Sequence, residues 1–284
     1  MTTQSIRVGV VGVGYLGAIH ARIYAAMSGV ELVGVTDIDG HAATRVAEEC
    51  GCSAYNEPEA LLDKADAVSI VVPTSSHRVV AEPYLRHGMH VLLEKPIADH
   101  LTNARAVVKA AEETGVILQI GHLERFNAGV VRLVQELDRP RFIEVHRLGP
   151  FVSRAADVDV VTDLMIHDID IVLSLVTADL TYVSAVGARV VSAHVDIANA
   201  RLEFADGTIA NVTASRVSSR KFRRIRVFGE ACYLGLDFVN QQVEVSRRTP
   251  HIEESGFVGI QTESIEVDTR PPLDAELEHF VACV

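Results

Sequence analysis

The first 120 residues alternate between short hydrophobic runs and longer stretches with helical periodicity. The helical stretches end at Gly29, Gly88 and Gly115, where glycine supplies the left-handed backbone that closes a helix. Pro83 lies inside one of them, so that helix is expected to be kinked or to begin late. This alternation predicts a parallel sheet with helices on both faces. The predicted strands cover 6–11, 30–36, 66–72, 90–93 and 116–120.

The pattern changes after residue 121. A helix is predicted at 127–137, a strand at 141–148 and a long apolar helix at 162–176. A series of strands follows, and Asp206-Gly207 and Gly229-Glu230 are hairpin turn signals between them. This half therefore reads as an α+β domain whose open sheet is mostly antiparallel. Its later strands are predicted at 182–191, 199–204, 208–217, 222–228, 232–237 and 242–246.

Composition narrows the protein class. The 284 residues are 48% hydrophobic and 23% charged, which is typical of a folded chain with two domains. The net charge of −12 argues against nucleic-acid binding. The sequence shows neither a membrane-length apolar stretch nor a signal peptide, so we expect a cytoplasmic protein without membrane contact. The thiols are expected to be reduced and no metal site is predicted; the cysteines are Cys50, Cys52, Cys232 and Cys283.

A glycine-rich loop follows the first predicted strand directly and opens a helix. It reads Gly12-Val-Gly14-Tyr15-Leu16-Gly17, in which the glycines permit a tight turn and close approach to a pyrophosphate. Asp37, twenty residues after Gly17, ends the second strand, where an acid binds the ribose hydroxyls. Because a carboxylate repels a 2′-phosphate, NAD is favoured over NADP. A methyltransferase would use a similar loop and acid. The pattern predicts a Rossmann domain over residues 1–121 and a second domain over 122–284.

Further polar groups follow the fourth and fifth strands, at the carboxyl edge where ligands bind in such sheets. The fourth strand leads into Pro73-Thr74-Ser-Ser-His77, and the fifth ends in Glu94-Lys95-Pro96. A lysine fixed by a proline at this edge is a candidate catalytic residue.

The long apolar helix of the second half carries a polar stripe. Asp163 and His167 are four residues apart and share a face, which Asp170 extends. Because the rest of the helix is apolar and therefore buried, these side chains must be paired or line a cavity. With the lysine, a catalytic role for Asp163 and His167 is favoured.

These motifs resemble the Gfo/Idh/MocA oxidoreductases over nearly the whole chain. The resemblance implies an NAD-dependent dehydrogenase acting on a CH–OH group, with Lys95, Asp163 and His167 beside the nicotinamide. It also implies a homodimer or homotetramer that forms through the C-terminal sheet. Family members continue beyond the helix predicted at 273–284. The cofactor-binding residues that it implies are Gly12, Gly14, Tyr15, Leu16, Gly17, Asp37, Pro73, Thr74, His77, Glu94 and Lys95.

Three stretches are similar to the branch that contains UDP-N-acetylglucosamine 3-dehydrogenase: 121–127, 163–171 and 196–201. This implies oxidation of the 3-hydroxyl of a UDP-sugar to a 3-keto sugar. Six cations between Arg216 and Arg226 suit a diphosphate, unless they are exposed strand residues paired with acids of another subunit. The candidate substrate-binding residues are Lys95, Arg125, Arg154, Asp163, His167 and Arg216, with Arg147 as a further candidate.

The predicted reaction needs a base for the hydroxyl proton and a donor for the developing oxyanion. His167 is assigned as base, with Asp163 fixing its tautomer, and Lys95 binds the oxygen or itself carries the proton. Two other functions remain open: a dehydrogenase or reductase of a free inositol, sugar or other carbonyl compound, and a non-catalytic sensor of NAD and a sugar nucleotide.

Overall fold

The computed structural model describes residues 5–152, 158–252, 258–267 and 270–284. The chain divides into two compact units, which are unit 1 (Met1–Leu123 and Leu273–Val284) and unit 2 (Glu124–Pro272). The sequence pattern placed all of 122–284 in the second domain, whereas the last helix, α7 (Pro272–Cys283), packs within unit 1. The reason is hydrophobic burial, because Leu277 and Phe280 of α7 lie fully buried in the same core as Val8.

Unit 1 contains a six-stranded parallel sheet in the order β3-β2-β1-β4-β5-β6, which is the doubly wound Rossmann arrangement. The expected strands are confirmed. The short β3 was not predicted, because it has three residues of which two are exposed and it carries no hydrophobic run. The strands are β1 (Ile6–Val11), β2 (Val30–Thr36), β3 (Ser53–Tyr55), β4 (Ala67–Ile70), β5 (His90–Glu94) and β6 (Leu118–Gly121).

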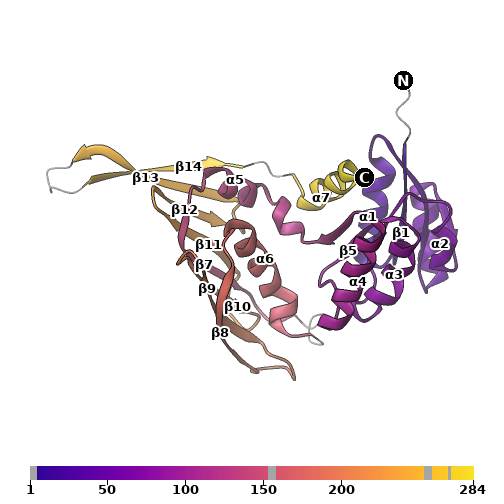
Figure 1. The fold of residues 1–284 in the computed structure, drawn as a ribbon, viewed down its shortest axis with the longest axis horizontal. Helices are drawn as coiled ribbons and strands as arrows, with labels where there is room; N and C mark the ends of the chain where they lie inside the picture. Colours follow the sequence, from indigo (N-terminus) through magenta and orange to yellow (C-terminus); the bar gives the residue numbers. More distant parts are fainter. Residues whose placement is uncertain (1–4, 153–157, 253–257, 268–269) are drawn as a thin grey trace. The chain divides into compact units, whose positions relative to one another are not determined.

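Helices cover both faces of this sheet (Figure 1). The helices α1 (Tyr15–Ala26) and α2 (Gly40–Cys50) share one core with α7, and α3 (His77–Arg86) and α4 (Leu101–Thr114) share the other. Gly88 and Gly115 have positive φ at the ends of α3 and α4, as predicted, whereas Gly29, also with positive φ, lies beyond α1, which ends at Ala26 with Met27 in an extended conformation. Pro83 lies inside α3, so that helix does not begin late. Within the described residues, no helix is both long and apolar enough to cross a membrane.

Unit 2 contains an eight-stranded sheet in the order β14-β13-β12-β11-β7-β10-β9-β8. The pair β7 and β10 is parallel and the other pairs are antiparallel. Helices α5 (Ala128–Glu136) and α6 (Ile166–Leu175) pack on one face, where the core of this unit lies. The strands are β7 (Pro140–Leu148), β8 (Leu180–Ala188), β9 (Ile197–Phe204), β10 (Ile209–Ser215), β11 (Phe222–Gly229), β12 (Cys232–Asp237), β13 (Gln242–Ile252) and β14 (Val258–Glu266).

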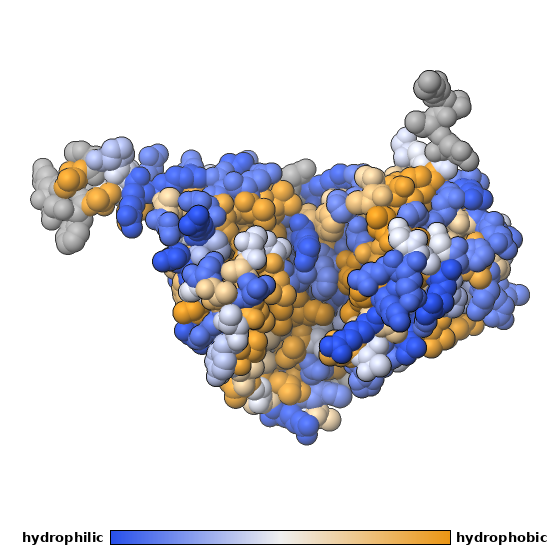
Figure 2. All heavy atoms as spheres, viewed as in Figure 1, coloured by the Kyte–Doolittle hydropathy of each residue, from blue (hydrophilic) through white to orange (hydrophobic). Residues whose placement is uncertain are grey.

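Two elements of unit 2 differ from the predicted pattern. The helix predicted at 162–176 begins with a π-helical turn, η5 (Val161–Met165), before α6. Strand β13 is longer than predicted and pairs with β14, which was missed because polar residues dominate this part of the chain. The β13–β14 hairpin carries exposed hydrophobic residues near its tip (Figure 2), and they are Ile252, Val258 and Ile260. All four cysteines are free thiols, as expected.

The turn after β8 is built around the buried carboxylate of Asp196. Its Oδ2 accepts N–H groups from Val190, Val191 and Ser192 at 2.7 to 3.0 Å, so the chain turns away and β8 ends at Ala188. Its Oδ1 accepts Nε of Arg216 at 2.8 Å. Burial alone would raise the pKa of Asp196, but these donors outweigh it and hold the pKa well below its ordinary value.

We predict that Asp196→Asn destabilises the protein at pH 7, because an amide cannot accept all of these donors. A lowered folded-state pKa stabilises above the unfolded pKa of about 3.9, and this stabilisation is lost as pH falls through the folded value. The difference in urea midpoint between wild type and variant should therefore be constant from pH 7 to about 5 and shrink below about pH 4. Equal midpoints at pH 7 would contradict this account.

Candidate functional site

The glycine loop of unit 1 is shaped by close backbone packing. Gly12 has a φ of +84°, and a Cβ there would lie 2.3 Å from the carbonyl oxygen of Val71. A Cβ at Gly17 would lie 1.8 Å from the carbonyl oxygen of Gly12, so both positions require glycine. A Cβ at Gly14 would meet nothing within 4 Å. The space beside Gly14 is where a pyrophosphate approaches the backbone in Rossmann domains.

The start of α1 is also suited to a pyrophosphate. Gly14 is its N-cap and provides no side-chain cap, so the first N–H groups of the helix are available to an anion. Asp37 lies beside the loop, and its carboxylate accepts N–H of Val13 at 2.7 Å and N–H of Asp39 at 2.9 Å. A carboxylate has further lone pairs for ribose hydroxyls, and its charge opposes a 2′-phosphate. The loop therefore fits NAD.

Lys95 follows β5 directly, at the same carboxyl edge of the sheet. The N–H of Lys95 donates to Glu94 Oε2 at 3.3 Å, and the Lys95–Pro96 peptide bond is cis. Glu94 is only 7% exposed, and its Oε1 lies 3.4 Å from Nε2 of His20. Nδ1 of His20 lies 2.8 Å from the hydroxyl of Ser69. The carboxylate of Glu94 therefore links the backbone of Lys95 to the side chain of His20.

His77 joins the two loops at this edge. It is 1% exposed, with Nδ1 at 2.9 Å from the carbonyl oxygen of Pro96 and Nε2 at 3.0 Å from that of Val72. Pro73 and Thr74 lie between Val72 and His77, at the start of the 3₁₀ turn η2 (Thr74–Ser76). The predicted cofactor residue His77 thus contacts the backbone on both sides and positions the loops that carry Thr74 and Lys95.

In unit 2, Asp163 lies in η5 and His167 in the first turn of α6. The acids that follow in sequence are held by arginines. Asp168 is fully buried and accepts Nη2 of Arg147 at 2.7 Å. Asp170 accepts Nε and Nη2 of Arg125, both at 2.7 Å. These pairs fix the helix that carries the predicted catalytic residues.

A cleft of about 230 Å³ in unit 2 has Asp163 in its wall. Four cations line it, and they differ in their partners. Arg216 is buried and bound to Asp196, and Arg147 is bound to Asp168. Arg154 lies outside the described residues. The lining residues are Arg147, Leu148, Gly149, Pro150, Val152, Asp163, Leu164, Arg216, Lys221 and Arg223.

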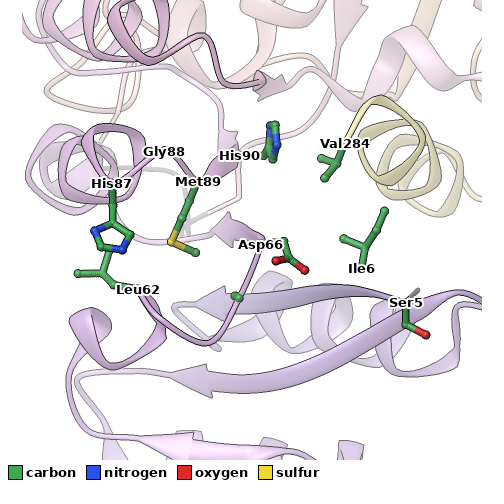
Figure 3. A pocket seen from close by; sticks show the side chains of 10 residues that line it. Ser5, Ile6, Leu62, Asp66, His87, Gly88, Met89, His90 and Val284 are labelled. Carbon is green, nitrogen blue, oxygen red and sulfur yellow. The ribbon is translucent and has the colours of Figure 1, made fainter. Parts of the chain in front are cut away.

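A wider pocket of about 530 Å³ lies in unit 1 (Figure 3). Its walls include Ile6 and His90, the first residues of β1 and β5, together with Asp66, which precedes β4. These are the amino ends of the strands, whereas ligands bind at the carboxyl ends in doubly wound sheets. Asp66 is moreover bound to Arg7 at 2.6 Å. This pocket is therefore not the candidate site. The described residues contain no cluster of His, Cys, Asp or Glu suited to a metal ion.

Comparison with known proteins identifies the family. The model of the oxidoreductase family with an NAD-binding Rossmann fold, Gfo/Idh/MocA, matches residues 6–122, and the model of the GFO/IDH/MocA C-terminal domain matches residues 129–234. The chain belongs to the Gfo/Idh/MocA oxidoreductases. As a member of this family it binds NAD through unit 1, which confirms the predicted fold and cofactor.

Individual Gfo/Idh/MocA proteins are similar over most of the chain. UDP-N-acetylglucosamine 3-dehydrogenase from Acidithiobacillus ferrooxidans is 40% identical over 98% of this chain and 88% of its own, and its solved structure superposes with a TM-score of 0.91. The scyllo-inositol 2-dehydrogenase (NAD(+)) of Bacillus subtilis is 32% identical over 76% of this chain and 68% of its own. Levoglucosan dehydrogenase in complex with NADH shares the fold at 18% identity, with a TM-score of 0.81 over 92% of this chain and 80% of its own.

Two residues of the cleft in unit 2 and one contact of Glu94 were not predicted from the sequence. Lys221 and Arg223 line the cleft, but only their membership in a basic run was noted. The alternation of side chains along a strand could have identified Arg223, because it is two residues from the buried Ile225 and therefore lies on the same face of β11. His20 carried no signal beyond its place in the first helix, since its contact with Glu94 joins residues 74 positions apart.

The two glycines of the loop should respond differently to alanine. Gly14→Ala should leave the melting temperature nearly unchanged but weaken NADH binding, because its methyl group occupies the pyrophosphate approach. Gly17→Ala should also destabilise the fold, by about 1–3 kcal/mol, because its methyl group overlaps the Gly12 carbonyl. Thermal unfolding and NADH fluorescence measure the two effects, and the chain has no tryptophan to interfere. Full NADH binding by Gly14→Ala would contradict the assignment of this loop.

Proposed function

We propose that this oxidoreductase acts in the cytoplasm and oxidises the 3-hydroxyl of a UDP-sugar similar to UDP-N-acetylglucosamine, giving a 3-keto sugar. The observation that carries the proposal is the 40% identity, over 98% of the chain, to an enzyme named for this reaction. The cation-lined cleft beside Asp163 supports it, because a sugar nucleotide brings a diphosphate.

The proposed mechanism assigns separate roles to three side chains. A ring nitrogen of His167 takes the proton of the substrate hydroxyl, and the carboxylate of Asp163 stabilises the imidazolium that forms. The ammonium group of Lys95 donates a hydrogen bond to the substrate oxygen and stabilises its developing negative charge. NAD, when bound, supplies the acceptor for the hydride that leaves the sugar carbon. Glu94 and His77 hold the loop of Lys95 in place.

The proposed binding residues fall into a cofactor set and a substrate set. Gly12 and Gly14 in the glycine loop, Tyr15 at the start of α1 and Asp37 beside the loop are proposed to hold the cofactor, and Tyr15 is 86% exposed. The remaining proposed cofactor residues are Leu16, Gly17, Pro73, Thr74, His77, Glu94 and Lys95. Among the proposed substrate-binding arginines, Arg216 lines the cleft although it is bound to Asp196, whereas Arg125 directs two donors to Asp170. The full proposed substrate set is Lys95, Arg125, Arg154, Asp163, His167 and Arg216.

We also propose that the chain forms a homodimer or homotetramer through the face of the unit 2 sheet opposite α5 and α6. Aromatic rings gather on this face, where Phe228 lies 5.8 Å from Phe142 and 4.9 Å from Tyr233 between ring centroids. Phe228 is 36% exposed and Phe222 is 44% exposed. Exposed aromatic rings on an open sheet are typical of a protein interface.

Lys95→Met tests the proposed function. It should lower the rate of NADH formation from NAD and UDP-N-acetylglucosamine by about 10²–10⁴-fold, because the oxygen loses its charged donor. NADH binding should stay nearly unchanged. The rate is followed at 340 nm with an aminotransferase trap that removes the 3-keto product.

Two outcomes would contradict the proposal in different ways. Loss of NADH binding in Lys95→Met would remove the lysine from the catalytic role. Wild-type NADH formation from free inositols or sugars, with none from UDP-N-acetylglucosamine, would replace the proposed substrate and favour the activity named for the Bacillus relative.

The interface proposal predicts that Phe228→Glu lowers the mass in solution, because the variant removes the ring that contacts Phe142 and Tyr233 and puts in its place a charge that must lose its water in the interface. Light scattering should give a dimer or tetramer for the wild type and a smaller assembly for the variant. A monomeric wild type would overturn it.

A further inference from the structure

Three arginines of the basic run between Arg216 and Arg226 lie on β11, and they divide between its two faces. Arg224 and Arg226 lie on one face of the strand. Arg224 forms an ion pair with Glu244 at 2.8 Å, and Arg226 forms one with Glu144. Arg223 lies on the other face, together with Ile225, which is fully buried in the core beneath the helices. One run in the sequence is therefore two different sets of cations in the fold.

Arg223 lies directly opposite another arginine. In the antiparallel register it pairs with Arg147 on β7, and both side chains face the cleft. Like charges in opposed positions destabilise a sheet unless they are compensated. Arg147 is compensated by ion pairs to Asp168 and Glu124 at 2.7 and 2.9 Å. Within the described part of the chain, the side chain of Arg223 forms neither an ion pair nor a hydrogen bond.

The electrostatic surroundings of Arg223 leave it poorly compensated. Burial lowers its pKa, and the Arg147 cation lowers it further, while the carboxylates of Glu124, Asp168 and Asp163 oppose these effects. Lys221, two residues before Arg223, is a second cation in the same cleft, and it too has no ion pair among the described residues. An anion in the cleft would compensate both.

We propose that Lys221 and Arg223 form the subsite for the diphosphate of the substrate, while Arg147 and Arg216 keep the cleft walls in place through their buried carboxylate partners. The planar guanidinium of Arg223 suits a phosphate, and the ammonium of Lys221 adds a second charge. The cleft, at about 230 Å³, is smaller than the roughly 300–1,000 Å³ of a whole small-molecule pocket, so it holds part of a ligand. The wall of this cleft includes Asp163, one of the proposed catalytic residues. This inference rests on the proposed function for the identity of the ligand.

The experiment compares two neighbouring arginines on opposite faces of the same strand. UDP is titrated by calorimetry into the full chain saturated with NAD, so that UDP does not enter the glycine loop. Arg223→Gln and Lys221→Gln should each raise the Kd for UDP by about tenfold or more. Arg224→Gln, the matched control, should leave it nearly unchanged. Arg223→Lys should recover part of the affinity, and uridine should bind equally weakly to every variant.

Unfolding curves and light scattering verify that each variant keeps the wild-type fold and assembly. If Arg223→Gln is unstable, Lys221→Gln decides, because Lys221 is exposed and buries no charge. Equal UDP affinity in Lys221→Gln, Arg223→Gln and the wild type, an equal loss in Arg224→Gln, or a wild type that binds no UDP would each overturn the proposal. Oxidation of UDP-N-acetylglucosamine with an unchanged KM in Arg223→Gln would overturn the subsite alone. Selective loss of UDP binding without any UDP-sugar oxidation would retain the subsite and reject the proposed reaction.

Discussion

The arrangement of unit 2 depends on the ion pairs of one buried guanidinium, that of Arg147. It lies in the middle of the sheet on β7, is 3% exposed, and binds Asp168 on α6 and Glu124 before α5. Removing either side of such a buried pair leaves an uncompensated charge, at a cost of about 3–5 kcal/mol. The pair therefore fixes α6 against the sheet. Because His167 is next to Asp168 and Asp163 lies in the π-helical turn that leads into α6, their placement depends on the same contact.

The same constraint explains why cations of similar sequence context have different roles. An arginine whose donors are used by buried carboxylates, such as Arg147 or Arg216, contributes to the fold, and its substitution changes stability first. Arg223 contributes no such contact and costs the fold energy through its like-charged neighbour. Binding sites commonly contain residues that lower the stability of the free protein and whose charge is compensated when the ligand binds. Charge count alone does not separate these two classes, whereas strand parity and partner contacts do.

The extent to which sequence predicted the structure follows from the range of the interactions. The glycine loop and Asp37 were predictable because they lie within one βαβ unit, where spacing determines geometry. The place of α7 in unit 1 was not, because Leu277 lies in one core with residues as distant in sequence as Val8, 269 positions earlier. Likewise, the pairing of Arg125 with Asp170 spans 45 residues, and an unpaired and a paired arginine look the same in a sequence. Hydrophobic periodicity also fails for β14, whose residues are mostly exposed.

The proposed function gives an acidic protein an acidic substrate, so the long-range repulsion between them must differ from the short-range attraction at the site. The net charge of −12 repels a sugar nucleotide at a distance, but charges more than a Debye length of about 8–10 Å apart are largely screened at physiological ionic strength. Inside that range the local cations decide the sign of the interaction. The proposed subsite places Arg223 and Lys221 in a cleft, where partial exclusion of water strengthens the attraction of a cation for phosphate. The ion pairs of Arg224 with Glu244 and of Arg226 with Glu144 neutralise the two arginines on the opposite face of β11.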